Sequence, residues 1–241
     1  MHAALGGSSG TGDGVQAPDL PASPEPALDV PDPAPLEKGD ASTWAPVRRT
    51  IFAHARPSRK AAVVVRLDTR TPEDTANIVL VLGRLRAADG RLWLHVRLPV
   101  LPNDRTGWVP RAALGGYGVV HTRFVVDLEQ LVATLLRGRR PVFRARIGVG
   151  EPAWPTPKGR FYIRNRLTSY ESPFYGPLAF GTSARSPTLT DWPDGGFIGI
   201  HGTNQPELLP GRVSHGCIRM RNEDILELGR RMPIGTPVTI R

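Results

Sequence analysis

Apolar positions between residues 44 and 116 recur with the two-residue period of β-strands. Residues 61–67 and 78–86 are runs rich in β-branched side chains, and residues 92–98 place an apolar side chain at every second position. Alternation of this kind is typical of a strand with one buried face. Asp89-Gly90 supplies a hairpin turn before the last of these runs. This part of the chain is therefore predicted to form short strands.

The pattern after residue 116 predicts both strands and a helix. Residues 119–126 and 141–149 are strand-like, whereas the leucine and valine positions of Leu128–Arg137 fit a helix of about ten residues. A further strand is expected at residues 160–163. The order strand, helix, strand is thus predicted to open the second half of the chain.

The last third of the chain is predicted to hold a long loop, a helix and a closing strand. Residues 167–196 show no period, and loops of that length inside a compact domain usually act as lids or binding walls. Residues 197–200 are expected to be a buried strand end. Asn222 is predicted to cap a helix over residues 223–229, with acidic residues in its first turn. Residues 235–240 are expected to close the chain as a strand.

Residues 1–44 are predicted to be a disordered spacer. They contain seven prolines and six glycines and no periodic apolar pattern, so they cannot bury enough surface to offset the entropy of ordering. The segment either provides reach between an anchor and folded domains or is a passive tail. The first residues lack the regions of a signal peptide, and no apolar run in the chain is long enough to span a membrane.

Charge is distributed unevenly. The 241 residues carry a formal net charge of +9, and residues 1–44 hold seven acidic side chains against one lysine, which leaves +15 on residues 45–241. A field of that sign attracts anionic partners such as nucleic acid, acidic polysaccharide or an anionic lipid surface, and it does not indicate which one. Nucleic acid is not predicted, because the sequence has no zinc-finger spacing, no aromatic RNP-like strand and no helix with a dense arginine stripe.

Cys217 is the only cysteine, so the fold rests on packing and not on internal disulfides. It follows Ser214-His215-Gly216, and Gly216 permits a tight turn with positive φ. The backbone amides of His215, Gly216 and Cys217 are expected to point to one side and form an oxyanion hole. Converging N–H groups and a nearby histidine favour the thiolate, which is the nucleophilic form of cysteine.

His201 is the candidate base. It directly follows the strand predicted at residues 197–200, and Gly202 ends that strand. A base held at the end of a rigid strand is preorganised for proton transfer. Two other interpretations remain open on the residues alone: Cys217 as an inert buried side chain, and a metal site built from His201, His215 and Cys217, which lacks a fourth ligand at useful spacing. We predict no metal and no cofactor.

The motifs around these two residues resemble one known family. The segment from His201 to Asn204, the spacing of sixteen residues from His201 to Cys217, and the run from Ser214 to Met220 resemble the signature of the YkuD-type L,D-transpeptidases. The resemblance covers about residues 117–241. It includes Val125-Val126-Asp127-Leu128, Gly148-Val149-Gly150, Thr156-Pro157-Lys158-Gly159, and the segment from Asn222 to Ile240.

The resemblance implies a cysteine acyltransferase that acts on peptidoglycan stem peptides. Cys217 would attack the carbonyl at the L-centre of the third stem residue and expel the terminal D-alanine. His201 would be the base and acid, oriented by the backbone carbonyl of Gly202. A side-chain amine of a second stem would then resolve the thioester and give a 3→3 cross-link, and carbapenems would acylate the same cysteine.

The substrate-binding residues are expected to include Ser214, Thr203, Phe197 and Arg219. Some family members have Asn two residues after the cysteine, where this chain has Arg219. The guanidinium either binds a substrate carboxylate through two hydrogen bonds or braces the loop. His215 likewise either shapes the loop or contacts substrate.

A second, separate resemblance lies earlier in the chain. Leu92–Arg97 followed by Thr106–Pro110 resembles the bacterial SH3-type barrel that accompanies cell-wall enzymes. This resemblance would imply binding to wall peptide or glycan. Trp93 and Trp108 are either ligand-binding residues or simply the barrel core.

Together these observations predict a mainly β protein with three parts. Residues 1–44 form the linker, residues 45–116 an SH3-like β-barrel, and residues 117–241 a YkuD-like β-sandwich catalytic domain with one or two helices. The predicted protein is an extracytoplasmic L,D-transpeptidase on the wall side of the envelope. Two alternatives stay open: an L,D-carboxypeptidase or endopeptidase that uses water as acceptor, and a catalytically silent wall-binding protein.

Overall fold

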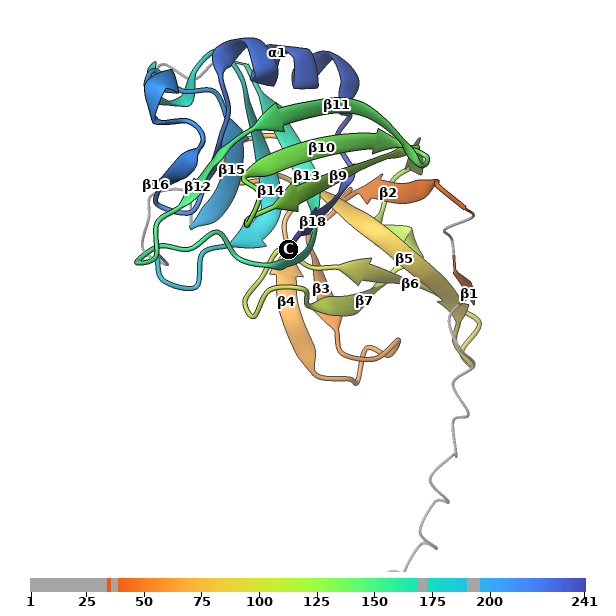
Figure 1. Ribbon diagram of the computed structural model, residues 1–241. Coiled ribbons are helices and arrows are strands. Elements are labelled where there is room, and N and C mark those ends of the chain that lie inside the picture. Colours follow the sequence, from red (N-terminus) through yellow and green to blue (C-terminus); the bar gives the residue numbers. More distant parts are fainter. Residues whose placement is uncertain (1–33, 36–38, 169–172, 190–195) are drawn as a thin grey trace, which may run out of the picture. The chain divides into compact units, whose positions relative to one another are not determined.

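Two β-sheets and one α-helix make up the part of the chain that the structure describes (Figure 1). The structure is a computed structural model, and it describes residues 34–35, 39–168, 173–189 and 196–241. The mainly β architecture predicted from the sequence is confirmed. Most of the spacer predicted at residues 1–44 lies outside the described residues, but Ala34–Pro35 and its last three residues, from Ser42, belong to strands, so these parts are not disordered.

The first sheet contains the strands of the N-terminal half, in the order β4-β3-β7-β6-β5-β2-β8, with β1 paired to β5. The strand predicted at residues 78–86 is confirmed as β5. Val79, Val81 and Val109 are completely buried in the core of this sheet. The strands are β1 (Ala34–Pro35), β2 (Ser42–Pro46), β3 (Ile51–His54), β4 (Val63–Leu67), β5 (Ile78–Arg86), β6 (Leu92–Arg97), β7 (Thr106–Pro110) and β8 (Gly118–Val120).

Strand β6 is buried on both faces, whereas its alternation predicted one buried face. Leu94 and Val96 belong to the main core of the sheet, and Trp93 lies in a separate small cluster with Trp108. The exposed fraction is 1% for Trp93 and 9% for Trp108. Both tryptophans are therefore core residues, and the interpretation that they bind a wall ligand is not supported. The likeness of the sheet to an SH3-type barrel stays a prediction.

The second sheet has the order β11-β10-β9-β18-β13-β14-β15-β17-β12-β16. The closing strand predicted at residues 235–240 is confirmed as β18, which is parallel to β9 and antiparallel to β13. The strands are β9 (Thr122–Asp127), β10 (Val132–Arg137), β11 (Arg140–Arg146), β12 (Gly148–Gly150), β13 (Gly159–Leu167), β14 (Ala179–Arg185), β15 (Phe197–His201), β16 (Gly211–Ser214), β17 (Ile218–Arg219) and β18 (Pro237–Ile240). Short 3₁₀ turns lie at Arg111–Ala113, Pro173–Tyr175 and Pro206–Leu208.

The helix predicted at Leu128–Arg137 is wrong, because this segment forms a hairpin. Asp127 ends β9, and its Oδ1 accepts hydrogen bonds from the amides of Glu129 and Gln130 at 3.2 and 2.9 Å. Leu131 has a φ of 53°, which turns the chain back into β10. Residue-by-residue pairing of β10 with both β9 and β11 then satisfies its backbone groups in the sheet.

The irregular segment predicted at residues 167–196 contains a central strand, β14. This strand is rich in small residues and lacks apolar alternation, so its sequence gives no period to detect. It is nevertheless buried along most of its length between β13 and β15. Parts of the predicted loop, at residues 169–172 and 190–195, lie outside the described residues.

Helix α1 (Asn222–Arg231) is confirmed, but Asn222 does not cap it. Arg221 is the N-cap residue, and Asn222 is already helical. Its side-chain Oδ1 instead accepts a hydrogen bond from the amide of Thr203 at 3.0 Å. Ile225 and Leu228 are completely buried in the core of the second sheet. No helix among the described residues is long and apolar enough to cross a membrane.

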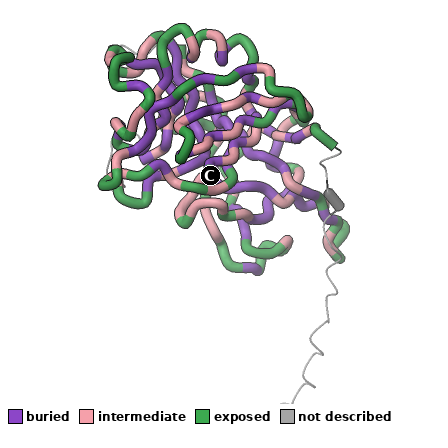
Figure 2. Tube along the Cα trace, viewed as in Figure 1, coloured by how far each residue is buried: buried purple, intermediate pink, exposed green. Residues whose placement is uncertain are grey.

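The two sheets belong to one compact unit that spans Pro31–Arg241. Tyr162 of β13 is completely buried and donates a hydrogen bond from its hydroxyl to the carbonyl of Ile78 in β5 at 3.0 Å. Arg97 of β6 donates to the carbonyl of Arg160 in β13 at 3.1 Å. Figure 2 shows buried segments along the strands of both sheets. The division into domains at residues 45–116 and 117–241 stays a prediction, and β8 belongs to the first sheet although it follows the predicted boundary.

Candidate active site

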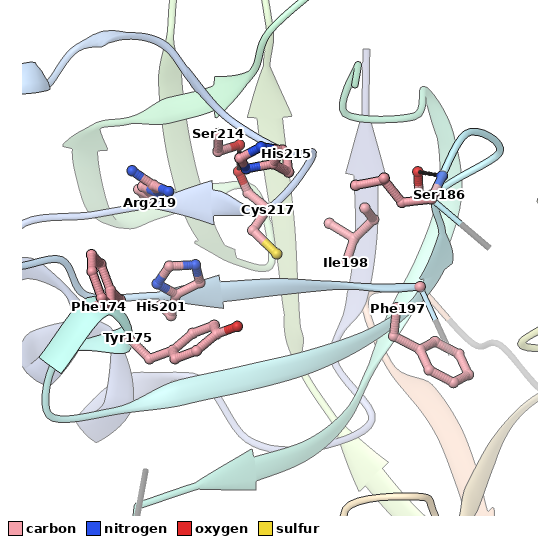
Figure 3. Close-up of a pocket in the computed structure, with 12 residues that line it drawn as sticks. Phe174, Tyr175, Ser186, Phe197, Ile198, His201, Ser214, His215, Cys217 and Arg219 are labelled. Atoms are coloured by element: carbon pink, nitrogen blue, oxygen red, sulfur yellow. Dashed lines mark hydrogen bonds between the residues drawn. The ribbon is translucent and has the colours of Figure 1, made fainter. Parts of the chain in front are cut away.

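A cavity of about 430 Å³ opens over the ends of β15, β16 and β17 in the second sheet (Figure 3). His201 and Cys217 both line it. A second cleft, of about 60 Å³, reaches the same two residues along β14 and β15. The structure therefore brings the two residues predicted to carry the chemistry to one place, where two hollows meet.

Parallel pairing of β15 with β17 sets this meeting point. Ile200 lies opposite Ile218, and His201 lies opposite Arg219. Cys217 immediately precedes β17, so its side chain reaches the backbone of β15, where the amide of Gly199 donates a hydrogen bond to Sγ at 3.3 Å. An N–H donor aimed at the sulfur supports negative charge there.

The imidazole of His201 is held in one tautomer. Its Nδ1 lies 2.6 Å from the carbonyl oxygen of Gly202, and because a carbonyl only accepts, Nδ1 is the protonated nitrogen. Nε2 is then the nitrogen that accepts a proton. The ring of Tyr175 contacts the imidazole edge to face, with 4.8 Å between the ring centres. The orienting role predicted for the Gly202 carbonyl agrees with this geometry.

Burial lowers the pKa of His201 to about 4. The hydrogen bond to Gly202 acts in the opposite direction, because the carbonyl favours the protonated ring, and the charge of Arg219 lowers the pKa further. The imidazole is 4% exposed. It is therefore neutral at physiological pH and able to accept a proton at Nε2.

Gly202 sits where a side chain has no space. A Cβ atom there would lie 2.3 Å from Oδ1 of Asn222 and 3.1 Å from the Cα of Gly176. The same Asn222 oxygen accepts a hydrogen bond from the amide of Thr203, so helix α1 holds the turn that follows His201. Asn222 was predicted only as a helix cap, because no local sequence pattern indicates a contact with Thr203.

Side-chain hydrogen bonds hold the loop before Cys217 in shape. Ser214 donates from Oγ to the carbonyl of Cys217 at 2.6 Å and accepts the amide of Gly216 at 3.1 Å. Gly216 has the predicted positive φ, at 114°. The amide of Gly216 thus serves the loop itself, and the oxyanion hole predicted from three amides stays a prediction. Ser214 lines the cavity and is 1% exposed, and its predicted contact with substrate stays a prediction.

Thr156 is a further supporting residue that sequence reasoning did not assign. Its hydroxyl donates to the carbonyl of Gly216 at 2.7 Å and accepts the amide of Gly150 at 2.9 Å. It thereby ties the nucleophile loop to β12. The only signal in the sequence was its place in the segment Thr156–Gly159, which carries part of the family resemblance.

The other predicted substrate residues fall in different places. Phe197 lines the cavity at the start of β15, and the guanidinium of Arg164 lies 3.7 Å from its ring centre. Thr203 is 2% exposed and its Oγ1 accepts the amide of Gln205, so it stabilises the turn and does not line the cavity. His215 is exposed, and its ring centre lies 4.3 Å from that of Trp154.

Arg219 projects over the same cavity (Figure 3). Its Nε is buried and has no hydrogen-bond partner among the described residues. A buried N–H without an acceptor destabilises the protein. An acidic ligand in the cavity would supply the missing acceptor. Among the described residues, no three side chains of His, Cys, Asp or Glu come together as a metal site, and the trio of His201, His215 and Cys217 is not one.

We expect His201 to make the protein less stable in acid. Its folded-state pKa of about 4 lies below the ordinary value of 6.5, so between these values only the unfolded chain takes up the proton. The contribution of His201 to the free energy of unfolding is fully present above about pH 6.5 and is lost as the pH drops below that value. We expect the free energy of unfolding to be lower by about 2 to 3 kcal/mol at about pH 4.5. Urea unfolding of the wild type and of His201→Gln at neutral pH and at about pH 4.5 measures this. An equal loss of stability in acid in both proteins would contradict the assignment of this loss to His201.

Comparison with known proteins places this site in a family. Residues 121–240 match the model of the YkuD family, the L,D-transpeptidase catalytic domain. A Bacillus subtilis protein that carries the name L,D-transpeptidase YkuD is 39% identical over 115 residues, which are 48% of this chain and 63% of that protein. Its Bacillus licheniformis namesake is 37% identical over 118 residues, 49% of this chain and 64% of that protein. The chain thus spans a little under two thirds of the length of these curated relatives.

A solved structure among the similar proteins is the catalytic domain of the Enterococcus faecium L,D-transpeptidase, determined by NMR. It is 28% identical, and the alignment covers 50% of this chain and 96% of that domain with a TM-score of 0.39. The family match spans His201, Cys217 and every side chain described above that supports their two loops. Residues 121–240 of this chain therefore belong to the YkuD family, as an L,D-transpeptidase catalytic domain.

Proposed function

We propose that the protein is a peptidoglycan L,D-transpeptidase that uses Cys217 as its nucleophile. The observation that carries this proposal is the neutral imidazole of His201. Its Nδ1 is committed to the Gly202 carbonyl, and its ring lines the same cavity as the Cys217 thiol. A neutral base beside a thiol is the arrangement that acyl transfer by cysteine requires.

In the first half-reaction Cys217 Sγ attacks the carbonyl at the L-centre of the third stem residue while its proton passes to Nε2 of His201. The amide of Gly199 is already directed at the sulfur. The tetrahedral intermediate collapses by breaking the C–N bond to the terminal D-alanine. That amine leaves with the proton from His201, and Cys217 carries the stem as a thioester.

In the second half-reaction the side-chain amine of another stem attacks the thioester. His201 accepts a proton from the attacking amine, the C–S bond breaks, and the proton returns to the Cys217 sulfur. The product is a 3→3 cross-link. Arg219 is proposed to hold a carboxylate of the donor stem, since it lines the larger cavity with a buried N–H that has no acceptor among the described residues.

The remaining parts of the proposal follow from this activity. Substrate of this kind lies on the wall side of the envelope, so we place the protein there. The charge of +15 on residues 45–241 favours residence on an anionic wall. We also propose that residues 45–116 form an SH3-like module, that residues 117–241 form the catalytic domain, and that carbapenems acylate Cys217.

Mass spectrometry of the protein with a disaccharide-tetrapeptide tests the activity. We expect the wild type to release D-alanine and to form muropeptide dimers, and Cys217→Ala to do neither. Free tripeptide without dimers would show the hydrolase that uses water as acceptor. If the muropeptide masses are the same after incubation with the wild type and with Cys217→Ala, the result would favour the catalytically silent wall-binding protein.

Gly199→Ala tests whether the space between nucleophile and base is needed. A Cβ at this position would lie 3.7 Å from Cys217 Sγ and 3.7 Å from His201 Cδ2, so the methyl group fits but occupies the path of the reacting atoms. We expect kcat/KM for D-alanine release to fall at least about tenfold, with stability unchanged or raised by up to about 1 kcal/mol. Gly116→Ala, where a Cβ meets nothing within 4 Å, is the matched control. Full activity in Gly199→Ala would contradict this geometry.

Arg219→Ala separates substrate binding from bracing of the loop. We expect the variant to lower kcat/KM about tenfold to a hundredfold, through loss of a charge-assisted contact, while iodoacetamide still alkylates Cys217 at the wild-type rate. Arg230→Ala, on the exposed face of α1, controls for the loss of one positive charge. A parallel loss of thiol reactivity would instead assign Arg219 to the loop, and unchanged turnover would exclude the substrate role.

A further inference from the structure

The second cleft at Cys217 has a wall that comes from the first sheet. Glu73 lines it, together with residues of β14 and β15. Glu73 belongs to the connection between β4 and β5, far outside residues 121–240 that match the catalytic family. The family match therefore assigns this residue no role.

Side chains of the second sheet hold Glu73 in place. Its Oε2 accepts a hydrogen bond from Arg164 Nη2 at 2.8 Å and from Asn165 Nδ2 at 3.1 Å. Asn165 also donates to Thr75 at 3.0 Å and accepts the amide of Gly181 at 3.0 Å. Both of these bonds use the same carboxylate oxygen, and the side chain keeps 11% of its surface exposed. The carboxylate is thus rigidly placed and still open to the cleft.

The two hollows that meet at Cys217 carry opposite charges. Arg219 lines the larger one and is absent from the smaller, whereas Glu73 lines only the smaller. Arg164, the partner of Glu73, lines neither, because its guanidinium is 1% exposed and lies against the ring of Phe197. A ligand in the smaller cleft therefore meets the carboxylate and not its partner.

We propose that Glu73 is the acceptor-recognition residue, which draws the cationic side-chain amine of the second stem into the smaller cleft. This inference rests on the proposed transpeptidase function. The larger cavity, with its cation, suits a donor stem that bears carboxylates. The smaller one, at about 60 Å³, suits an unbranched alkylammonium group. A positioned carboxylate raises the local concentration of such a cation.

The proton balance of this step is complete. The ammonium group binds at Glu73 and loses one proton to solvent, which gives the free amine. That amine attacks the Cys217 thioester, His201 takes its second proton, and the C–S bond breaks. The proton on His201 then returns to the sulfur. Glu73 binds and orients the acceptor, and it neither gains nor loses a proton in the cycle.

The test compares a cationic and an uncharged acceptor on the same thioester. The full chain is given a disaccharide-tetrapeptide donor with either a peptide bearing a free lysine side chain or hydroxylamine, which is largely uncharged at about pH 8. In Glu73→Gln we expect the KM for the lysine peptide to rise about tenfold, so that use of the lysine peptide relative to hydroxylamine falls by that factor. Glu73→Asp, which keeps the charge, should recover part of the loss.

Controls separate recognition from folding and from the proposed function. Glu129→Gln removes the same charge at an exposed turn between β9 and β10 and should match the wild type. An unchanged preference in Glu73→Gln, or an equal loss with both acceptors, would overturn the acceptor role and leave Glu73 as a structural residue. If the wild type releases no D-alanine, or forms only free tripeptide with either acceptor, the transpeptidase proposal itself fails and the role of Glu73 falls with it.

Discussion

The pairing of β15 with β17 is the constraint on which the active site depends. These strands are short, yet their register decides that the Cys217 thiol reaches the backbone of Gly199 while His201 ends the neighbouring strand. Ile200 and Ile218 face each other across this pair and are completely buried, and each contributes about 2 kcal/mol of burial energy to it. The apolar core beneath the sheet therefore determines how the Cys217 thiol and the His201 imidazole are placed relative to each other.

The loops beyond these strands are shaped by side-chain hydrogen bonds. Asn222 holds the turn after His201 from helix α1, while Ser214 and Thr156 hold the turn before Cys217 from within the loop and from beside β12. Each bond satisfies a backbone group that no strand pairing reaches. Gly216 supplies the one conformation in this loop that other residues rarely adopt. Catalytic groups on loops can thus be as well fixed as groups on strands.

Sequence patterns predicted what is local and missed what depends on contacts distant in the chain. The predicted base, the predicted nucleophile and the glycine turn lie in two short motifs, and β5 has a continuous apolar run, so sequence patterns could indicate them. The segment at Leu128–Arg137 has a leucine spacing that suits a helix, but Asp127 and the positive φ of Leu131 make it a hairpin. Strand β14 is composed of small residues and is detectable only through its neighbours. No pattern in residues 45–116 could have indicated that Glu73 lines a cleft together with Cys217.

The buried pair of Arg164 and Glu73 connects the first sheet to this site in a way that stability alone does not explain. Taking both charges out of water costs more free energy than burying an apolar pair of similar size. In addition, Nε and Nη1 of Arg164 have no hydrogen-bond partner among the described residues. The guanidinium lies on the ring of Phe197, the first residue of β15, and that strand ends at His201. A cation is thus fixed at one end of the strand and the neutral imidazole of His201 at the other. What the pair contributes is a defined position for a carboxylate at the smaller cleft, which a flexible surface glutamate would not provide.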